Sequence, residues 1–133
     1  MISNLEGARM SDDSILIIDD SPEWTDLLSA FFSSRYRVRV ANCATRAIEM
    51  AIEDLPNVII VDLLMPSVDG FGMIRRLKDT LAEEVPTVLF TGWNKAEIEA
   101  CAASIGCAAV MSKCASLDEL GDVVSSVVAR RAA

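Results

Sequence analysis

The fold is decided by residues 58–70, whose sequence is VIIVDLLMPSVDG. Four apolar β-branched residues, Val58 to Val61, lead directly into the carboxylate of Asp62. A short apolar run of this kind is typical of a strand that is buried on both faces, as in a parallel sheet. The pairs Met65-Pro66 and Asp69-Gly70 favour a turn before the next helix. We therefore expect Asp62 at the carboxyl end of a central strand, where open α/β sheets have their binding crevice.

The rest of the chain repeats this pattern of an apolar strand followed by an amphipathic helix. The segment 36–40 alternates polar and apolar residues, which is typical of a half-exposed edge strand. Five such units predict an α/β fold, a single (βα)5 domain whose parallel sheet has helices on both faces and right-handed crossovers. The expected strands are residues 14–18, 36–40, 58–61, 86–90 and 107–111.

Three of the expected helices have a capping signal at their start, in the form of a serine cap with proline in the first turn or of a capping box. These signals are Ser21-Pro22, Asn94 with Glu97, and Ser116 with Glu119. Gly106 is expected to end the fourth helix.

Apolar residues at helical spacing predict which faces the helices bury. On the first helix they are Trp24, Leu27, Leu28 and Phe31, and on the second Ala44, Ala47, Ile48, Ala51 and Ile52. On the third helix they are Phe71, Ile74, Leu77 and Leu81, and on the last Leu117, Leu120, Val124, Val127 and Val128. Val123 widens the apolar face of the last helix, which indicates either deep burial or contact with a partner protein. We slightly favour partner contact.

Length and composition indicate one folded domain. The chain has 133 residues, of which 52% are hydrophobic and 24% charged, which excludes an intrinsically disordered chain. Residues 1–13 are expected to form a polar tail without the apolar core of a signal peptide, and residues 14–131 the domain. The net charge of −8 argues against nucleic acid or an anionic membrane as partner. No apolar run approaches the ~18 residues of a membrane span, so we expect a cytoplasmic protein.

Cysteine and histidine content excludes several kinds of site. The four cysteines, Cys43, Cys101, Cys107 and Cys114, lack the CxxC spacing of zinc and redox sites. We expect free thiols with a mainly packing role. The chain has no histidine, which excludes Ser-His and Cys-His catalysis and zinc sites built on imidazole. Any phosphohistidine would have to belong to a partner protein.

Polar side chains follow four of the five expected strands. Asp19-Asp20 follow the first strand, Asp62 the third, Thr91 the fourth and Lys113 the fifth. Because parallel strands end at the same edge of a sheet, we expect these side chains to lie close together. Asp19-Asp20 could instead only cap the first helix, but Ser21 suits that role better.

These residue types suit phosphoryl transfer with Mg²⁺. Carboxylates held close together repel one another, and a bound cation relieves the repulsion. An all-oxygen ligand set suits Mg²⁺ better than zinc, and Mg²⁺ commonly binds phosphate oxygens as well. Asp62 is the expected nucleophile, since a carboxylate can accept a phosphoryl group covalently. Lys113 would stabilise charge on the transferring group, and Thr91 would donate a hydrogen bond to it.

Residues 14–131 resemble the receiver domain of bacterial two-component response regulators. The resemblance rests on motifs in the family's order and spacing, which are Asp19-Asp20, Asp62 with Met65-Pro66 and Asp69-Gly70, Thr91-Gly92, and Lys113. It implies a flavodoxin-like sheet with strand order 2-1-3-4-5. It also implies a phosphoacceptor rather than an enzyme.

The resemblance further implies the roles of the acids. Asp62 would take its phosphoryl group from the phosphohistidine of a sensor histidine kinase or a histidine phosphotransfer protein. Asp20, Asp62 and the backbone carbonyl of Leu64 would bind Mg²⁺ directly, and Asp19 would bind it through water.

Thr91 and Lys113 would hold the phosphoryl group and couple it to the surface formed by the fourth helix, fifth strand and fifth helix. Through that surface the domain would bind a downstream protein or a second copy of itself.

Two positions depart from the family's pattern. Val110 lies three positions before Lys113, where the family usually has an aromatic switch residue, so no ring can report phosphorylation from that position. Cys114 follows the lysine where the family usually has proline, often after a cis peptide bond. We therefore expect a trans peptide bond and a displaced loop there.

Leu64 and Trp93 lie two positions after Asp62 and Thr91, respectively. We expect them to shield an acyl phosphate from water, so that the phosphorylated protein loses its phosphoryl group slowly. For Trp93 an ordinary packing role is the alternative.

The leading hypothesis is a stand-alone receiver that docks a partner or relays its phosphoryl group. The alternative is a phosphorylation-independent interaction module on the same scaffold. The intact acids, Thr91 and Lys113 argue against it, whereas Val110 and Cys114 keep it open. A haloacid-dehalogenase-like phosphatase would need a second acid two residues after the nucleophile, where Leu64 stands. A flavodoxin-like cofactor binder would need a Ser/Thr/Gly-rich phosphate loop after the first strand, and none is present.

Overall fold

The computed structural model describes residues 12–62, 70–92 and 95–132, and within these residues strands and helices alternate along the chain. The elements are β1 (Ser14–Ile18), α1 (Pro22–Phe32), β2 (Arg37–Ala41), α2 (Ala44–Glu53), β3 (Val58–Val61), α3 (Gly70–Thr80), β4 (Thr87–Thr91), α4 (Lys95–Ser104), β5 (Ala109–Ser112) and α5 (Leu117–Ala132).

The strands form one parallel five-stranded sheet in the order β2-β1-β3-β4-β5. The α/β fold and the flavodoxin-like strand order are therefore confirmed. Ile18 pairs with Val61 and Thr91 pairs with Ser112. Because the strands are parallel and in this register, the residues that follow them emerge at one edge of the sheet.

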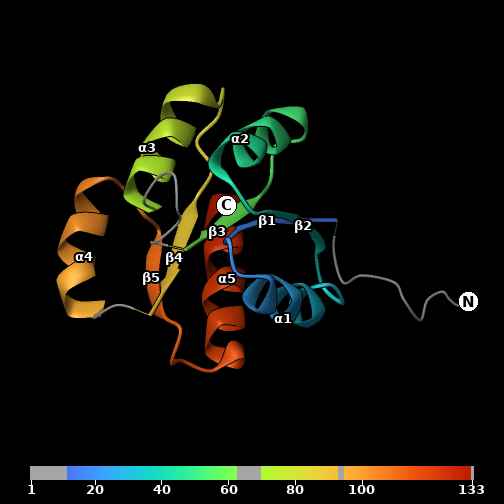
Figure 1. Cartoon of the computed structure of the whole chain (residues 1–133), viewed down its shortest axis with the longest axis vertical. Helices are drawn as coiled ribbons and strands as arrows, with labels where there is room; N and C mark the ends of the chain where they lie inside the picture. Colours follow the sequence, from blue (N-terminus) through green and yellow to red (C-terminus); the bar gives the residue numbers. More distant parts are fainter. Residues whose placement is uncertain (1–11, 63–69, 93–94, 133) are drawn as a thin grey trace, which may run out of the picture.

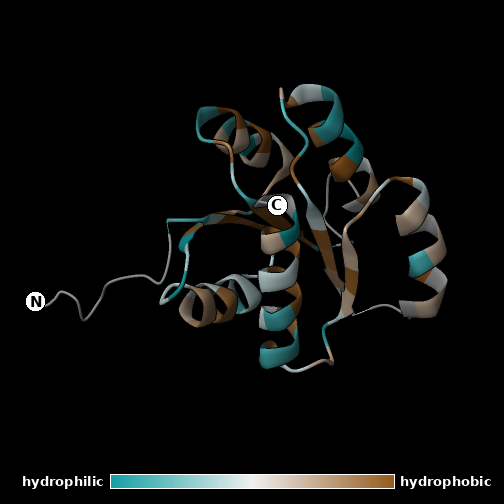
Figure 2. Cartoon of the chain, turned by 180° about the vertical axis from the view of Figure 1, so that it is seen from behind, coloured by the Kyte–Doolittle hydropathy of each residue, from teal (hydrophilic) through white to brown (hydrophobic). Residues whose placement is uncertain are grey.

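Two apolar layers hold the helices against the sheet. Residues of α1 and α5 pack with Ile15, Ile17 and other residues on one face, and residues of α2, α3 and α4 pack on the opposite face. Figure 1 shows this division, with α2 above the sheet and α1 below it. The strands are predominantly brown in Figure 2, whereas teal residues occur on the helices. The apolar strand residues thus form the centre of both layers.

The capping predictions that fall on described residues are confirmed. The hydroxyl of Ser21 accepts the Trp24 backbone N–H at 3.5 Å. The Ser116 hydroxyl accepts the Glu119 N–H at 3.1 Å, and the Glu119 carboxylate accepts the Ser116 N–H at 3.3 Å. Gly106 follows α4 with φ of +79°, a conformation that glycine adopts without strain. The predicted capping box at Asn94 lies outside the described residues.

The helical stripes were predicted less accurately than the strands. Ile52 was expected to be buried but is 59% exposed, and Leu27 is 46% exposed. The prediction for Ile52 is wrong because α2 packs over the sheet margin at β2 and β1, where only a narrow stripe of the helix meets the core. Met73 is fully buried, and the predicted stripe omitted it although it lies one helical turn before Leu77.

On α5 the predicted stripe packs on the sheet, and Leu120 and Val124 are fully buried. Val123 is partly buried against the same core. No helix among the described residues is both long and apolar enough to cross a bilayer.

Candidate functional site

Three carboxylates meet at the carboxyl edge of the sheet. Asp19 follows β1 and is 3% exposed, Asp62 follows β3 and is 9% exposed, and Asp20 is exposed. One carboxylate oxygen of each lies within 4.8 Å of the other two. The backbone fixes this geometry, since the Asp62 N–H donates to the Ile18 carbonyl at 2.9 Å and thereby holds the end of β3 beside β1.

The ammonium of Lys113 joins two of these acids. Its Nζ lies 3.0 Å from Oδ2 of Asp19 and 3.5 Å from Oδ1 of Asp62, and the lysine side chain is 14% exposed. The buried pairing is charge-assisted and shielded from water, so it is stronger than a surface ion pair. The sequence prediction that a lysine after the fifth strand would face these acids is confirmed.

Both oxygens of Asp19 are engaged by the protein. Oδ1 accepts the Ser21 backbone N–H at 3.0 Å, and Oδ2 accepts the hydrogen bond from Lys113. Asp19 therefore anchors the start of α1 and the lysine at the same time. Asp20 is the more accessible acid of the adjacent pair.

The donor set of the acidic cluster fits Mg²⁺. Three carboxylates opposite one ammonium leave an excess of negative charge, and hard carboxylate oxygens are typical Mg²⁺ ligands. The exposure of Asp20 leaves room for the waters that Mg²⁺ usually keeps.

Thr91 lies at the same edge as the last residue of β4 and is fully buried. Its carbonyl accepts the Lys113 N–H at 2.7 Å, so the backbone at Thr91 is tied directly to the lysine. Leu64 and Trp93, which the sequence also placed near the site, lie outside the described residues.

Sequence reasoning missed the contact between Trp24 and the site. Nζ of Lys113 lies 4.9 Å from the centroid of the Trp24 ring. Trp24 was expected only as part of the apolar stripe of the first helix. Its place in the first turn of α1, which starts at the sheet edge where Asp19 and Asp20 lie, is a signal that could have suggested the contact.

Two positions depart from the family's pattern. The first, Val110, is buried, with 9% of its surface exposed. The Lys113–Cys114 peptide bond is trans as predicted, since no described peptide bond is cis.

Cys43, Cys107 and Cys114 are free thiols, as expected. The predicted packing role is wrong for Cys43 and Cys114, which are exposed because they lie on the loops after β2 and β5. Burial raises the pKa of the Cys107 thiol above its usual value, against smaller lowering effects of Thr87 and Lys78.

Comparisons with known proteins agree with this geometry. Residues 15–125 match the family described as the response regulator receiver domain. The response regulator Rre1 of Synechocystis sp. is 32% identical over 123 residues, which cover 90% of this chain and 53% of Rre1. The response regulator PleD of Caulobacter vibrioides is 39% identical over 79 residues, which cover 58% of this chain and 17% of PleD. The chain thus spans about half the length of Rre1 and a smaller part of PleD.

Solved structures share the fold. A two-component response regulator from Clostridium difficile superposes with a TM-score of 0.84 at 20% identity, covering 92% of this chain and all (100%) of the other. A response regulator receiver domain protein from Clostridium thermocellum gives a TM-score of 0.82 at 20% identity, covering 90% of this chain and 96% of the other. At these identities the likeness shows the fold alone.

Proposed function

The chain belongs to the family of response regulator receiver domains, and from that membership we propose that Asp62 accepts a phosphoryl group from a partner's phosphohistidine with the help of Mg²⁺. The observation that best supports the proposal is the convergence of Asp19, Asp20 and Asp62 beside the Lys113 ammonium. A receiver domain is a phosphoacceptor module rather than a catalytic enzyme. The partner that supplies the group is a sensor histidine kinase or a histidine phosphotransfer protein.

In the proposed transfer an Asp62 carboxylate oxygen attacks phosphorus. The P–O bond of an acyl phosphate forms while the P–N bond to the partner's histidine breaks, and the imidazole leaves with the electron pair of that bond and takes up a proton. Lys113 faces the reacting carboxylate from 3.5 Å and stabilises the added negative charge. Thr91 donates its hydroxyl to a phosphoryl oxygen.

Asp20, Asp62 and the backbone carbonyl of Leu64 would hold Mg²⁺, with Asp19 acting through water. This division agrees with the engagement of both Asp19 oxygens by Ser21 and Lys113. When bound, the ion supplies positive charge to the phosphoryl oxygens.

We place the domain at residues 14–131, preceded by a polar tail at residues 1–13, in the cytoplasm. The phosphorylated domain would act by relaying its phosphoryl group or by docking a protein through the surface of α4, β5 and α5. The net charge of −8 favours a protein partner over nucleic acid or a membrane.

The experiment that tests this function is incubation of the protein with acetyl phosphate, with and without Mg²⁺, followed by intact-mass measurement. We expect one added phosphoryl group per chain, only with Mg²⁺, and none in Asp62→Asn. The matched control is Asp26→Asn, which changes an exposed acid of α1 and should leave phosphorylation intact. Equal phosphorylation of wild type and Asp62→Asn would overturn the proposal. A complete lack of phosphorylation would favour the phosphorylation-independent interaction module.

The lifetime of the product tests the predicted shielding by Leu64 and Trp93. After removal of the donor, phosphorylated Asp62 should persist for minutes or longer in Mg²⁺ buffer. Loss within seconds without a phosphatase would show that the acyl phosphate is not shielded.

A further inference from the structure

An aromatic ring from α1 contacts the lysine of the acidic site. The Lys113 ammonium lies 4.9 Å from the centroid of the Trp24 ring, which is within the range of a cation–π interaction. The same ammonium pairs with Asp19 at 3.0 Å, and its side chain is only 14% exposed. The ammonium thus has carboxylates and a ring as neighbours and little contact with water.

The ring itself is held in place by the protein. It packs edge-on against Phe90, with ring centroids 5.3 Å apart and an interplanar angle of 88°. Phe90 is 1% exposed and immediately precedes Thr91 in β4, so it offers a rigid support. The Trp24 backbone N–H donates to the hydroxyl of Ser21, whose own N–H donates to Asp19. Ring, helix start and acid therefore form one connected unit.

From these contacts we propose that Trp24 is a positioning residue for Lys113, which holds the ammonium beside Asp62 in the geometry needed for phosphoryl transfer. Lysine is a point charge on a flexible stem of four carbons, so its ammonium can also reach solvent or the exposed Asp20. The Trp24 ring favours the position in which the ammonium lies beside Asp62 over positions in solvent. This proposal rests on the proposed phosphoacceptor role of Asp62.

A packing role alone would make a different prediction. Leucine restores much of the apolar bulk of Trp24 but has no π face, whereas phenylalanine keeps a weaker one. If the π face positions the lysine, the effect of Trp24→Leu on the reaction must depend on the presence of the ammonium. If Trp24 only packs α1 against β4, Trp24→Leu must change the rate by the same factor with or without the Lys113 ammonium.

The test is a double-mutant cycle on the rate of phosphorylation by acetyl phosphate at fixed Mg²⁺. Trp24→Leu should lower the rate about fivefold and Trp24→Phe about twofold, as expected for losing or weakening a cation–π contact. In the Lys113→Met background, Trp24→Leu should change the residual rate less than twofold. Phe31→Leu is the matched control, since Phe31 is a partly buried ring of the same helix that packs on Phe32. It should leave the rate within twofold of wild type.

Urea unfolding of every variant identifies the folded proteins, and rates are compared among those. An equal effect of Trp24→Leu with and without Lys113, or no effect in either background, would overturn the positioning role. Should Trp24→Leu not fold, Trp24→Met, which is also apolar and has no π face, replaces it in the same cycle. Failure of wild type to become phosphorylated would instead contradict the proposed function, so the two failures are distinguishable.

Discussion

The two edges of the sheet differ in how their charged side chains are arranged. At the carboxyl edge, the Lys113 ammonium lies 3.0 Å from Asp19 and 3.5 Å from Asp62, and all three side chains are largely buried. At the amino edge, a hollow of about 410 Å³ lies beside the starts of β4 and β5 and the last turns of α5. It is lined by Glu84, Pro86, Ala108, Val127 and Arg130.

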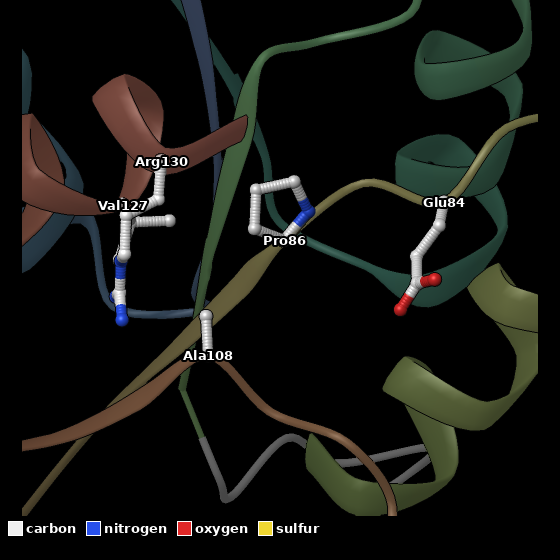
Figure 3. Close-up of a pocket in the computed structure, with 5 residues that line it drawn as sticks. All are labelled: Glu84, Pro86, Ala108, Val127 and Arg130. Carbon is white, nitrogen blue, oxygen red and sulfur yellow. The ribbon is translucent and has the colours of Figure 1, made fainter. Parts of the chain in front are cut away.

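The charges at the amino edge do not converge. In Figure 3 the carboxylate of Glu84 and the guanidinium of Arg130 lie on opposite sides of Pro86. Glu84 pairs with Lys78 at 3.3 Å, where the glutamate side chain is 79% exposed. The hollow at the amino edge therefore offers an apolar wall and solvated charges, whereas the carboxyl edge offers buried charges in contact. This difference shows that converging buried charges, which a hollow does not by itself provide, distinguish the candidate site from the amino edge.

The strongest test of this contrast removes one cation at each edge. Lys113→Met should lower the rate of phosphorylation by acetyl phosphate about 100-fold, the scale of losing one preorganised charge in a reaction site. Arg130→Met should leave the rate within twofold. Radiolabel incorporation over time measures both, and a comparable loss in the two variants would contradict the contrast.

A second test removes one acid at each edge. Asp20→Asn should weaken Mg²⁺ binding at least about tenfold, because it deletes a proposed direct ligand. Glu84→Gln should leave the affinity unchanged. Thermal unfolding against Mg²⁺ concentration gives the affinities, since saturation at a hundred times Kd stabilises a protein by about 2.7 kcal/mol. Retention of wild-type affinity by Asp20→Asn would remove Asp20 from the metal site.

The two cysteines that flank β5 differ in the same way as the two edges, one being exposed and the other partly buried. Cys114 is exposed at the carboxyl edge, whereas burial raises the pKa of Cys107 at the amino edge. Since the thiolate is the reactive form, Cys114 should react with iodoacetamide about tenfold faster than Cys107 at pH 8. Peptide mapping by mass spectrometry measures the two rates.

The same raised pKa has a consequence for stability. The folded protein holds the Cys107 proton more tightly than the unfolded chain, whose thiol has the ordinary value of 9.0. The contribution of this pKa difference to the free energy of unfolding is therefore fully present below pH 9, and it is lost as the pH rises through the pKa of Cys107 in the folded protein. Above pH 9, the free energy of unfolding of Cys107→Ser, measured by urea unfolding, should fall less with rising pH than that of wild type.

The smallest expected effect comes from filling the hollow. Ala108→Leu places a larger apolar side chain against the wall lined by Pro86 and Val127. We expect the phosphorylation rate to stay within twofold of wild type, because this edge lies at the opposite end of the strands from Asp62. A severalfold change would mean that the two edges are coupled.

The strands and the acidic cluster could be predicted from sequence because both depend on local patterns. Val58 to Val61 are buried as their β-branched run indicated, and Asp62 follows them at the sheet edge. Parallel topology then brings Asp19 and Lys113 to the same place although 94 positions separate them. The βα alternation predicts that these residues share one edge of the sheet, and the family resemblance supplied the strand order.

The missed features depend on packing between elements. Ile52 is exposed because α2 lies at the sheet margin, and helical periodicity cannot predict where a helix lies on the sheet. The contact of Trp24 with Lys113 requires the rotamers of two side chains on different elements. The engagement of both Asp19 oxygens depends likewise on the path of the backbone at Ser21.

The proposed function requires that Asp62 is the phosphoacceptor of an Mg²⁺ site that Lys113 completes. The most direct test is a crystal structure of the protein grown with Mg²⁺ and beryllofluoride, an analogue of the phosphoryl group. We predict beryllium bonded to a carboxylate oxygen of Asp62, Mg²⁺ on Asp20 and Asp62, and the Lys113 ammonium within hydrogen-bond distance of a fluorine. Beryllofluoride bound elsewhere, or Lys113 turned away from Asp62 in that complex, would contradict the proposed role of Asp62.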